Sequence, residues 1–253
     1  MNVSLFQYDP FWEDKKSNQQ KIVELIQLSK IKTDVLVFPE MTLTGFTMRS
    51  KKYSESIDGE TLKFFQEIAQ KYNIHVFGGF VENVKGKFFN CLVHVDGTGK
   101  LQTKYHKIHP FSFSGENRHY SPGKNLVTTT IDDIEIGMSI CYDLRFPELF
   151  RHYAKKRVTT IINIANWPVQ RIEHWQNLLK SRAIENLCYM IGVNRVGKDK
   201  GNNYNGRSAV YGPFGEEIIL MDNSEKIVTF ELENQRVIDT REKFPFLNDI
   251  RII

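Results

Sequence analysis

The length, composition and charge of the chain limit the kind of protein it can be. Its 253 residues allow one domain with a large core, and no linker divides them, so we expect a single domain over residues 1–253. A net charge of +4 spread along the chain gives no support for a nucleic-acid partner. No apolar run reaches membrane-spanning length and no signal-peptide pattern is present, so we expect no membrane partner. The three cysteines show neither metal-ligand spacing nor an even-numbered disulfide framework, which predicts a reducing, cytoplasmic location.

Strands and helices alternate along the chain. Apolar runs and alternation predict strands, whereas apolar residues at helical spacing predict helices. In chain order, the predicted strands cover residues 3–8, 35–38, 75–82, 88–96, 101–106, 126–131, 134–141, 158–163, 189–196, 209–211, 217–220 and 227–232, and the predicted helices cover residues 15–29, 61–72, 147–156, 172–187 and 235–242. Residues 110–123 lack periodicity, which predicts a surface loop. The pattern predicts an α/β or α+β fold with helices covering sheets.

A cysteine at the end of a predicted strand is the most informative feature of the chain. Residues 134–151, IEIGMSICYDLRFPELFR, read as a buried strand that ends at Cys141, a turn, and a helix that begins at a proline. A thiol there faces the N-terminus of the helix, whose N–H groups and dipole favour a thiolate. Taken alone, Cys141 is better interpreted as a small buried apolar side chain, which is what most free cysteines are.

Two further strand ends carry groups that complement this thiol. Glu40 follows one predicted strand and Lys107 follows another. Strand ends converge at one edge of a sheet, where α/β proteins build their sites. A carboxylate can take the proton of a thiol, and an ammonium can stabilise the oxyanion that forms when the thiol attacks a carbonyl. Each residue alone is consistent with a solvated strand end, but together they favour acyl transfer through a cysteine nucleophile.

Three motifs containing these residues resemble the signatures of a known family. VFPE (37–40), KIHPF (107–111) and ICYDLRFPE (140–148) are similar to the three signatures of the nitrilase superfamily of carbon–nitrogen hydrolases. The resemblance covers nearly the whole chain. It implies a four-layer αββα sandwich, a homodimer and a Glu-Lys-Cys triad. PEMTLTGF (39–46) together with NWPVQRIEHW (166–175) resembles the ω-amidase branch. Its members cleave the terminal amide of short dicarboxylic monoamides such as 2-oxoglutaramate and 2-oxosuccinamate.

The resemblance also implies a role for each residue of the site. Cys141 would be the nucleophile that forms a thioester, and Glu40 would move the protons of the reaction. Lys107 and the backbone N–H of Tyr142 would hold the oxyanion. Glu116 matches a second carboxylate beside the triad, where it would orient Lys107 or the substrate amide; the alternative is an exposed loop glutamate.

A substrate-binding role is expected for Arg145, four residues after Cys141. Its guanidinium could hold a substrate carboxylate through two hydrogen bonds, and the resemblance places an arginine there near the acyl pocket. The alternative is an internal ion pair with Asp143 or Glu148. Three aromatic residues are candidates for the pocket walls: Phe46, Phe111 and Trp167.

No cofactor and no metal are expected, because the proposed chemistry needs none. His106, His109 and His174 fit no metal-binding spacing and are predicted to be structural. Cys91 and Cys188 are predicted to be packing residues. Lys104 also precedes a histidine, but only Lys107 is followed by the His-x-Phe pattern.

Three classes of function remain open at this point. The first is an ω-amidase-type hydrolase whose partners are a small amide and water. The second keeps the triad but changes the substrate or the acyl acceptor, as in another amidase, a nitrilase, a carbamoyl hydrolase or an N-acyltransferase. The third is a catalytically silent binding protein on the same fold, which the intact Glu40, Lys107 and Cys141 disfavour.

Overall fold

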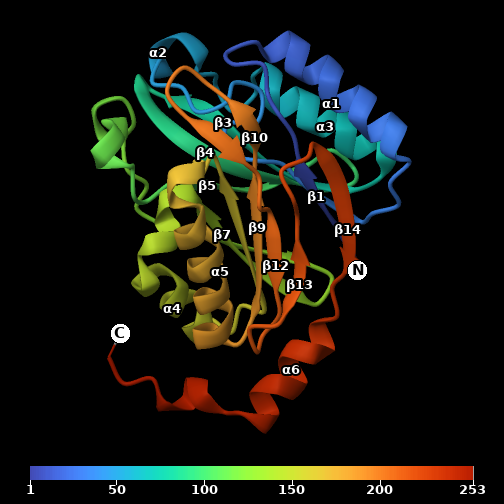
Figure 1. The fold of residues 1–253 in the computed structure, drawn as a ribbon, viewed down its shortest axis with the longest axis vertical. Helices are drawn as coiled ribbons and strands as arrows, with labels where there is room; N and C mark the ends of the chain where they lie inside the picture. The colour runs from blue at the N-terminus through green and yellow to red at the C-terminus, as the bar shows by residue number, and fades with distance from the viewer. Residues whose placement is uncertain (253) are drawn as a thin grey trace.

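Two six-stranded β-sheets form the centre of the structure, a computed structural model that describes residues 1–252 (Figure 1). The strand order is β14-β1-β2-β3-β4-β5 in the first sheet and β13-β12-β9-β8-β7-β6 in the second. The first sheet contains β1 (Asn2–Gln7), β2 (Val35–Val37), β3 (His75–Val84), β4 (Lys87–Val95), β5 (Leu101–His106) and β14 (Lys226–Glu231). The second contains β6 (Thr128–Ile131), β7 (Ile134–Ile140), β8 (Thr160–Ala165), β9 (Tyr189–Asn194), β12 (Ala209–Tyr211) and β13 (Glu217–Leu220).

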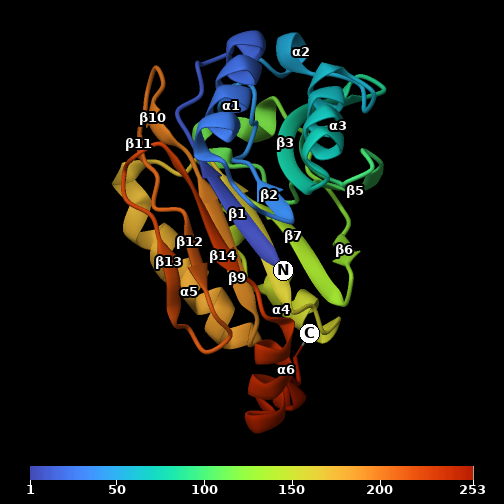
Figure 2. The ribbon, with the colours of Figure 1, turned by 90° about the vertical axis from the view of Figure 1, so that its right-hand side faces the viewer.

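Helices cover the outer face of each sheet. In Figures 1 and 2, α1 and α3 lie on one side of the strands, and α4 and α5 lie on the other. The fold is therefore the four-layer αββα sandwich that the family resemblance implies, and this expectation is confirmed. The helices are α1 (Lys15–Ser29), α2 (Ser50–Tyr53), α3 (Glu60–Tyr72), α4 (Pro147–Lys155), α5 (Ile172–Asn186) and α6 (Asn234–Lys243).

Both sheets have the same pattern of strand directions. In the first sheet β1, β2 and β3 are parallel, and β4, β5 and β14 are added antiparallel. In the second β7, β8 and β9 are parallel, and β6, β12 and β13 are added antiparallel. Helical crossovers join the parallel strands, because a tight turn cannot connect two strands that run in the same direction.

Three buried layers of side chains hold the sandwich together. Leu5 of β1 and Ile162 of β8 belong to the central core between the sheets, whereas Phe6 packs with the side chains of α1 and α3. Ile161 faces the other way and packs with Trp175 of α5. Consecutive strand residues thus enter different layers, which explains why the parallel strands read as continuous apolar runs.

Several observed elements differ from the predicted ones. The predicted surface loop over residues 110–123 contains two short 3-10 helices, η1 (Ser112–Ser114) and η2 (Glu116–Arg118), and Glu116 within it is fully buried. The structure also contains α2 and a hairpin formed by β10 (Val196–Lys198) and β11 (Asn203–Asn205), which were not predicted, and β8 begins two residues later than the strand predicted over residues 158–163. Within residues 1–252, no helix is long and apolar enough to cross a membrane.

Candidate active site

The position of Glu40 depends on a glycine in the neighbouring strand. Glu40 lies three residues beyond the end of β2, and its segment is held against β3 by a 2.8 Å hydrogen bond from the Thr42 N–H to the carbonyl of Gly79. A Cβ atom on Gly79 would lie 2.7 Å from the backbone nitrogen of Met41 and 3.1 Å from the Cα of Glu40. A larger residue at position 79 would therefore push Glu40 out of place.

The Glu40 carboxylate is buried and accepts hydrogen bonds from both sheets. Its Oε1 accepts from Asn90 Nδ2 of β4 at 2.7 Å and from Lys107 Nζ at 3.0 Å. Its Oε2 accepts from the backbone N–H of Asn166, just after β8, at 2.8 Å. These contacts fix the orientation of the buried carboxylate.

Lys107 connects Glu40 to a second buried carboxylate. It follows β5 directly, is 1 % exposed, and its Nζ lies 2.9 Å from Glu116 Oε2 and 3.1 Å from Glu116 Oε1. Burial alone would lower the pKa of Lys107, but Glu116 and Glu40 raise it well above its ordinary value, so the ammonium stays charged. Lys104 lies elsewhere, paired with Glu82.

Cys141 opens the short 3-10 helix η3 (Cys141–Arg145) at the end of β7. Its φ of +46° lies in the left-handed region, an uncommon conformation for a residue other than glycine and one often found at functional sites. Burial and the nearby charge of Glu40 raise the pKa of the thiol well above its ordinary value, while Lys107 acts in the opposite direction. This direction favours the protonated thiol and a reaction in which a base takes the proton, whereas stabilisation of a thiolate by the following helix stays a prediction.

A buried aspartate ties the Cys141 turn to the segment after Lys107. Asp143 Oδ2 accepts from the Ile140 N–H at 3.0 Å and from the Tyr105 hydroxyl at 2.8 Å. Asp143 Oδ1 accepts from the backbone N–H of His109 at 3.0 Å and contacts His109 Nδ1 at 2.8 Å. These bonds fasten the first sheet to the second beside the site.

Cys141 and Lys107 line a small cavity of about 160 Å³. Aromatic side chains form much of its wall, and the three charged residues that line it are all cationic: Lys107, Arg145 and Arg171. The predicted aromatic wall residues Phe46, Phe111 and Trp167 all line this cavity, together with Tyr142 and Tyr204. A cavity of this size admits a short acyl chain.

Arg145 faces this cavity without an acidic partner. Its Nη2 donates to His174 Nδ1 at 3.2 Å, and its guanidinium lies 4.9 Å from the centre of a Trp167 ring. Within residues 1–252, no carboxylate lies within 4.0 Å of Arg145. Asp143 instead pairs with His109, so the alternative of an internal ion pair with Asp143 or Glu148 is not observed.

Several polar residues of the site were not predicted from the sequence. Asn90 and Asn166 donate to Glu40, and Arg171 and Tyr204 line the cavity. A signal existed for two of them, because Asn166 and Arg171 both lie within the NWPVQRIEHW motif. No local pattern marks Asn90, which lies in the middle of a strand.

The three histidines considered as a metal cluster do not come together. His109 contacts Asp143, His174 contacts Arg145, and His106 contacts Glu82.

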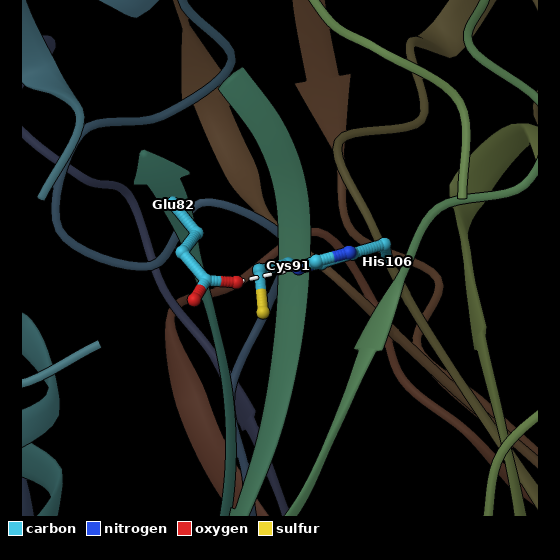
Figure 3. Close-up of side chains that lie close together, drawn as sticks. All are labelled: Glu82, Cys91 and His106. Carbon is cyan, nitrogen blue, oxygen red and sulfur yellow. Dashed lines mark hydrogen bonds and ion pairs between the residues drawn. The ribbon is translucent and has the colours of Figure 1, made fainter. Parts of the chain in front are cut away.

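A different group of potential metal ligands is formed by Glu82, Cys91 and His106 on neighbouring strands of the first sheet (Figure 3). Their ligand atoms lie within 4.8 Å of one another. Both oxygens of Glu82 already have partners, since Lys104 Nζ lies 2.5 Å from Oε1 and His106 Nε2 lies 2.5 Å from Oε2. The lysine already supplies the positive charge that neutralises this carboxylate, so we assign no metal to the group.

Comparison with known proteins identifies the class of this fold and site. The family model described as Carbon-nitrogen hydrolase matches residues 2–242, and the chain therefore belongs to this family, within the nitrilase superfamily. The resemblance noted in the sequence is thus confirmed, and the protein is a carbon–nitrogen hydrolase.

Individual relatives show which enzymes of the family this chain is similar to. The chain is 30% identical to a 2-oxoglutaramate amidase from Bacillus subtilis, with 98% of this chain and 97% of that protein covered. It is 33% identical to the omega-amidase YafV from Escherichia coli, covering 98% and 96%. Its structure matches a CN-hydrolase superfamily protein from Xanthomonas campestris, solved with an arsenic adduct in the active site, with a TM-score of 0.95, 28% identity, and 100% and 98% of the two chains covered.

Proposed function

We propose that this protein hydrolyses the terminal amide of short dicarboxylic monoamides of the 2-oxoglutaramate and 2-oxosuccinamate type. The observation that carries this proposal is the cavity that Cys141 and Arg145 share, with the buried Glu40–Lys107–Glu116 cluster beside it. The names of the relatives from B. subtilis and E. coli support the same type of substrate. Cys141 and Lys107 offer groups for acyl transfer, and Arg145 offers a partner for the substrate carboxylate.

In the first half of the proposed reaction, Cys141 forms a thioester. Its sulfur attacks the amide carbon while Glu40 takes the thiol proton, which the raised pKa of the thiol makes necessary. Lys107 Nζ and the backbone N–H of Tyr142 hold the oxyanion. Glu40 then passes the proton to the amide nitrogen, the carbon–nitrogen bond breaks, and ammonia leaves.

In the second half, water releases the acid. Glu40, now ionised again, takes a proton from the water as its oxygen attacks the thioester carbon. The carbon–sulfur bond breaks, and the proton returns from Glu40 to the sulfur. Glu116 positions Lys107 throughout through its two contacts of 2.9 and 3.1 Å.

Ammonia release from a panel of substrates tests this proposal. We expect turnover of 2-oxosuccinamate and succinamate, and little turnover of nitriles and N-carbamoyl compounds. Cys141→Ala should abolish turnover and keep the circular dichroism spectrum, and intact-protein mass spectrometry should find the acyl adduct on Cys141. Preferred turnover of a nitrile or carbamoyl compound would favour another reaction of the superfamily. An adduct on Cys91 or Cys188 would contradict the assignment of the nucleophile, and absence of all turnover would favour a binding protein.

Arg145→Ala tests the expected carboxylate contact. A lost charge-assisted hydrogen bond is worth about 1.5–3 kcal/mol, so kcat/KM for succinamate should fall about ten- to a hundredfold. Turnover of a neutral amide such as butyramide should change little. Equal losses on both substrates would mean that Arg145 supports the Cys141 turn instead of the substrate. Arg145→Lys should recover only part of the loss, because an ammonium lacks the planar fork.

A further inference from the structure

A second guanidinium lines the cavity and has no role in the reaction described above. Arg171 ends the short 3-10 helix η4 (Val169–Arg171), directly before α5, and its side chain is half-buried. It shares the lining of the cavity with Cys141 and Arg145.

Contacts on both sides hold Arg171 in position. Its backbone N–H donates to the Pro168 carbonyl at 3.1 Å, and its carbonyl accepts from the indole Nε1 of Trp167 at 2.7 Å. Its guanidinium carbon lies 5.3 Å from the centre of the Phe111 ring. The ring system of Trp167 also lies under the guanidinium of Arg145. Trp167 therefore contacts both arginines: its Nε1 donates to the backbone of Arg171, and its ring packs against the guanidinium of Arg145.

The two guanidiniums are not neutralised by the protein. Within residues 1–252, neither has a carboxylate within 4.0 Å, and no aspartate or glutamate lines the cavity. The charge of Lys107, in contrast, is balanced by Glu40 and Glu116. Burial lowers the pKa of Arg145 and the charge of Arg171 lowers it further, so the two arginines repel each other. A ligand rich in acceptor oxygens removes this repulsion, and a cationic ligand adds to it.

We propose that Arg171 selects substrates by the substituent on C2, the carbon beside the carboxylate at the end of the substrate far from the reacting amide. This inference rests on the proposed function. Arg145 and Arg171 together hold the three acceptor oxygens of a 2-oxo carboxylate. An ammonium on the same carbon, as in asparagine or glutamine, would face two guanidiniums and is rejected. The enzyme then acts on 2-oxo acid monoamides in the presence of the corresponding amino acids.

Three four-carbon substrates that differ only at C2 test the proposal: 2-oxosuccinamate, succinamate and asparagine. The wild type should prefer them in that order. In Arg171→Gln, kcat/KM for 2-oxosuccinamate should fall about ten- to a hundredfold, as expected for a lost charge-assisted hydrogen bond. Succinamate should lose less, and the discrimination against asparagine should shrink. Arg251→Gln, at an exposed arginine near the C-terminus, is the matched control. A uniform loss on all three substrates would overturn the proposal, since a merely structural arginine would give that result.

A binding measurement separates this proposal from the proposed function. Calorimetry on Cys141→Ala should find that 2-oxoglutarate binds more tightly than glutarate and that glutamate does not bind. Adding Arg171→Gln should remove the preference for the 2-oxo acid. Binding that distinguishes these acids without any amidase turnover would refute only the proposed function. Equal affinities with and without Arg171, or no binding of 2-oxoglutarate, would overturn the role of Arg171.

Discussion

Replacing Glu116 with glutamine should reduce both stability and activity. The carboxylate accepts hydrogen bonds from Asn90 Nδ2 at 3.0 Å, from Lys107 Nζ at 2.9 and 3.1 Å, and from the backbone N–H of Phe111. Glutamine keeps the shape but converts one oxygen into an NH₂ group. In either orientation this group faces a donor, because each oxygen of Glu116 accepts from Lys107 and from one other N–H.

The expected loss of stability follows from the burial of this cluster. Removing one partner of a buried ion pair costs about 3–5 kcal/mol, and Glu40 remains on Lys107 at 3.0 Å, so we expect about 3 kcal/mol. In a chain of this size 1 kcal/mol shifts the Tm by about 2–4 °C, so the Tm should fall by about 6–12 °C. The variant should still fold at 25 °C, because domains are stable by about 5–15 kcal/mol.

Turnover should fall more than substrate affinity in the same variant. A less restrained Lys107 stabilises the oxyanion poorly, which lowers kcat by about tenfold or more with a smaller change in KM. Thermal unfolding and ammonia release measure the two effects, with Glu67→Gln on the exposed side of α3 as the control. If Glu116→Gln matched this control in both Tm and kcat, the carboxylate would be neither a structural nor a positioning partner of Lys107.

Two further predictions concern protonation. In Glu40→Gln, the pKa of the Cys141 thiol should fall, because the charge of Glu40 helps to raise it, and turnover should be lost with the proposed base. The pH midpoint of alkylation by iodoacetamide measures the pKa of the thiol. An unchanged or higher midpoint would contradict this prediction. For Glu82, burial alone would raise the pKa, but hydrogen bonds from His106 and Lys104 lower it below its ordinary value. Its ionised form therefore stabilises the fold above the unfolded-state pKa of about 4.3, and this contribution is lost as the pH falls through the lower folded-state pKa. In urea titrations, the stability difference between wild type and Glu82→Gln should shrink below about pH 4; a constant difference would refute it.

Much of the fold could be predicted because its signals are local. The apolar run over residues 35–38 and the observed β2 agree within one residue, and the helical spacing over residues 15–29 matches α1. The groups at the strand ends were predictable for a related reason, because a strand signal in the sequence also shows where the strand ends. Glu40 and Lys107 were found by their positions at or just past such ends, and the structure places Lys107 Nζ 3.0 Å from Glu40 Oε1.

The rest of the site depends on contacts between distant parts of the chain. Asn166 donates to Glu40 across 126 residues, and no local pattern records such a pair. Glu116 lies in a polar segment without periodicity, so its burial was only one of two open alternatives. Arg171 directly precedes a helix, where charged residues are common and mostly solvated. Only the tertiary structure shows that it enters the cavity.

The groups proposed to react follow strands of different sheets. Glu40 and Lys107 follow strands of the first sheet, and Cys141 follows a strand of the second, so the distance between the thiol and its proposed base depends on how the two sheets are placed. The sheets interlock beside Glu40, where a Cβ on Gly79 would lie 2.8 Å from Ile164 Cδ1 of the opposite sheet. A misplacement of about 1 Å can cost about a hundredfold in rate. We therefore expect that substitutions which change side-chain volume in the central core, far from the substrate, shift Cys141 relative to Glu40 and lower the rate.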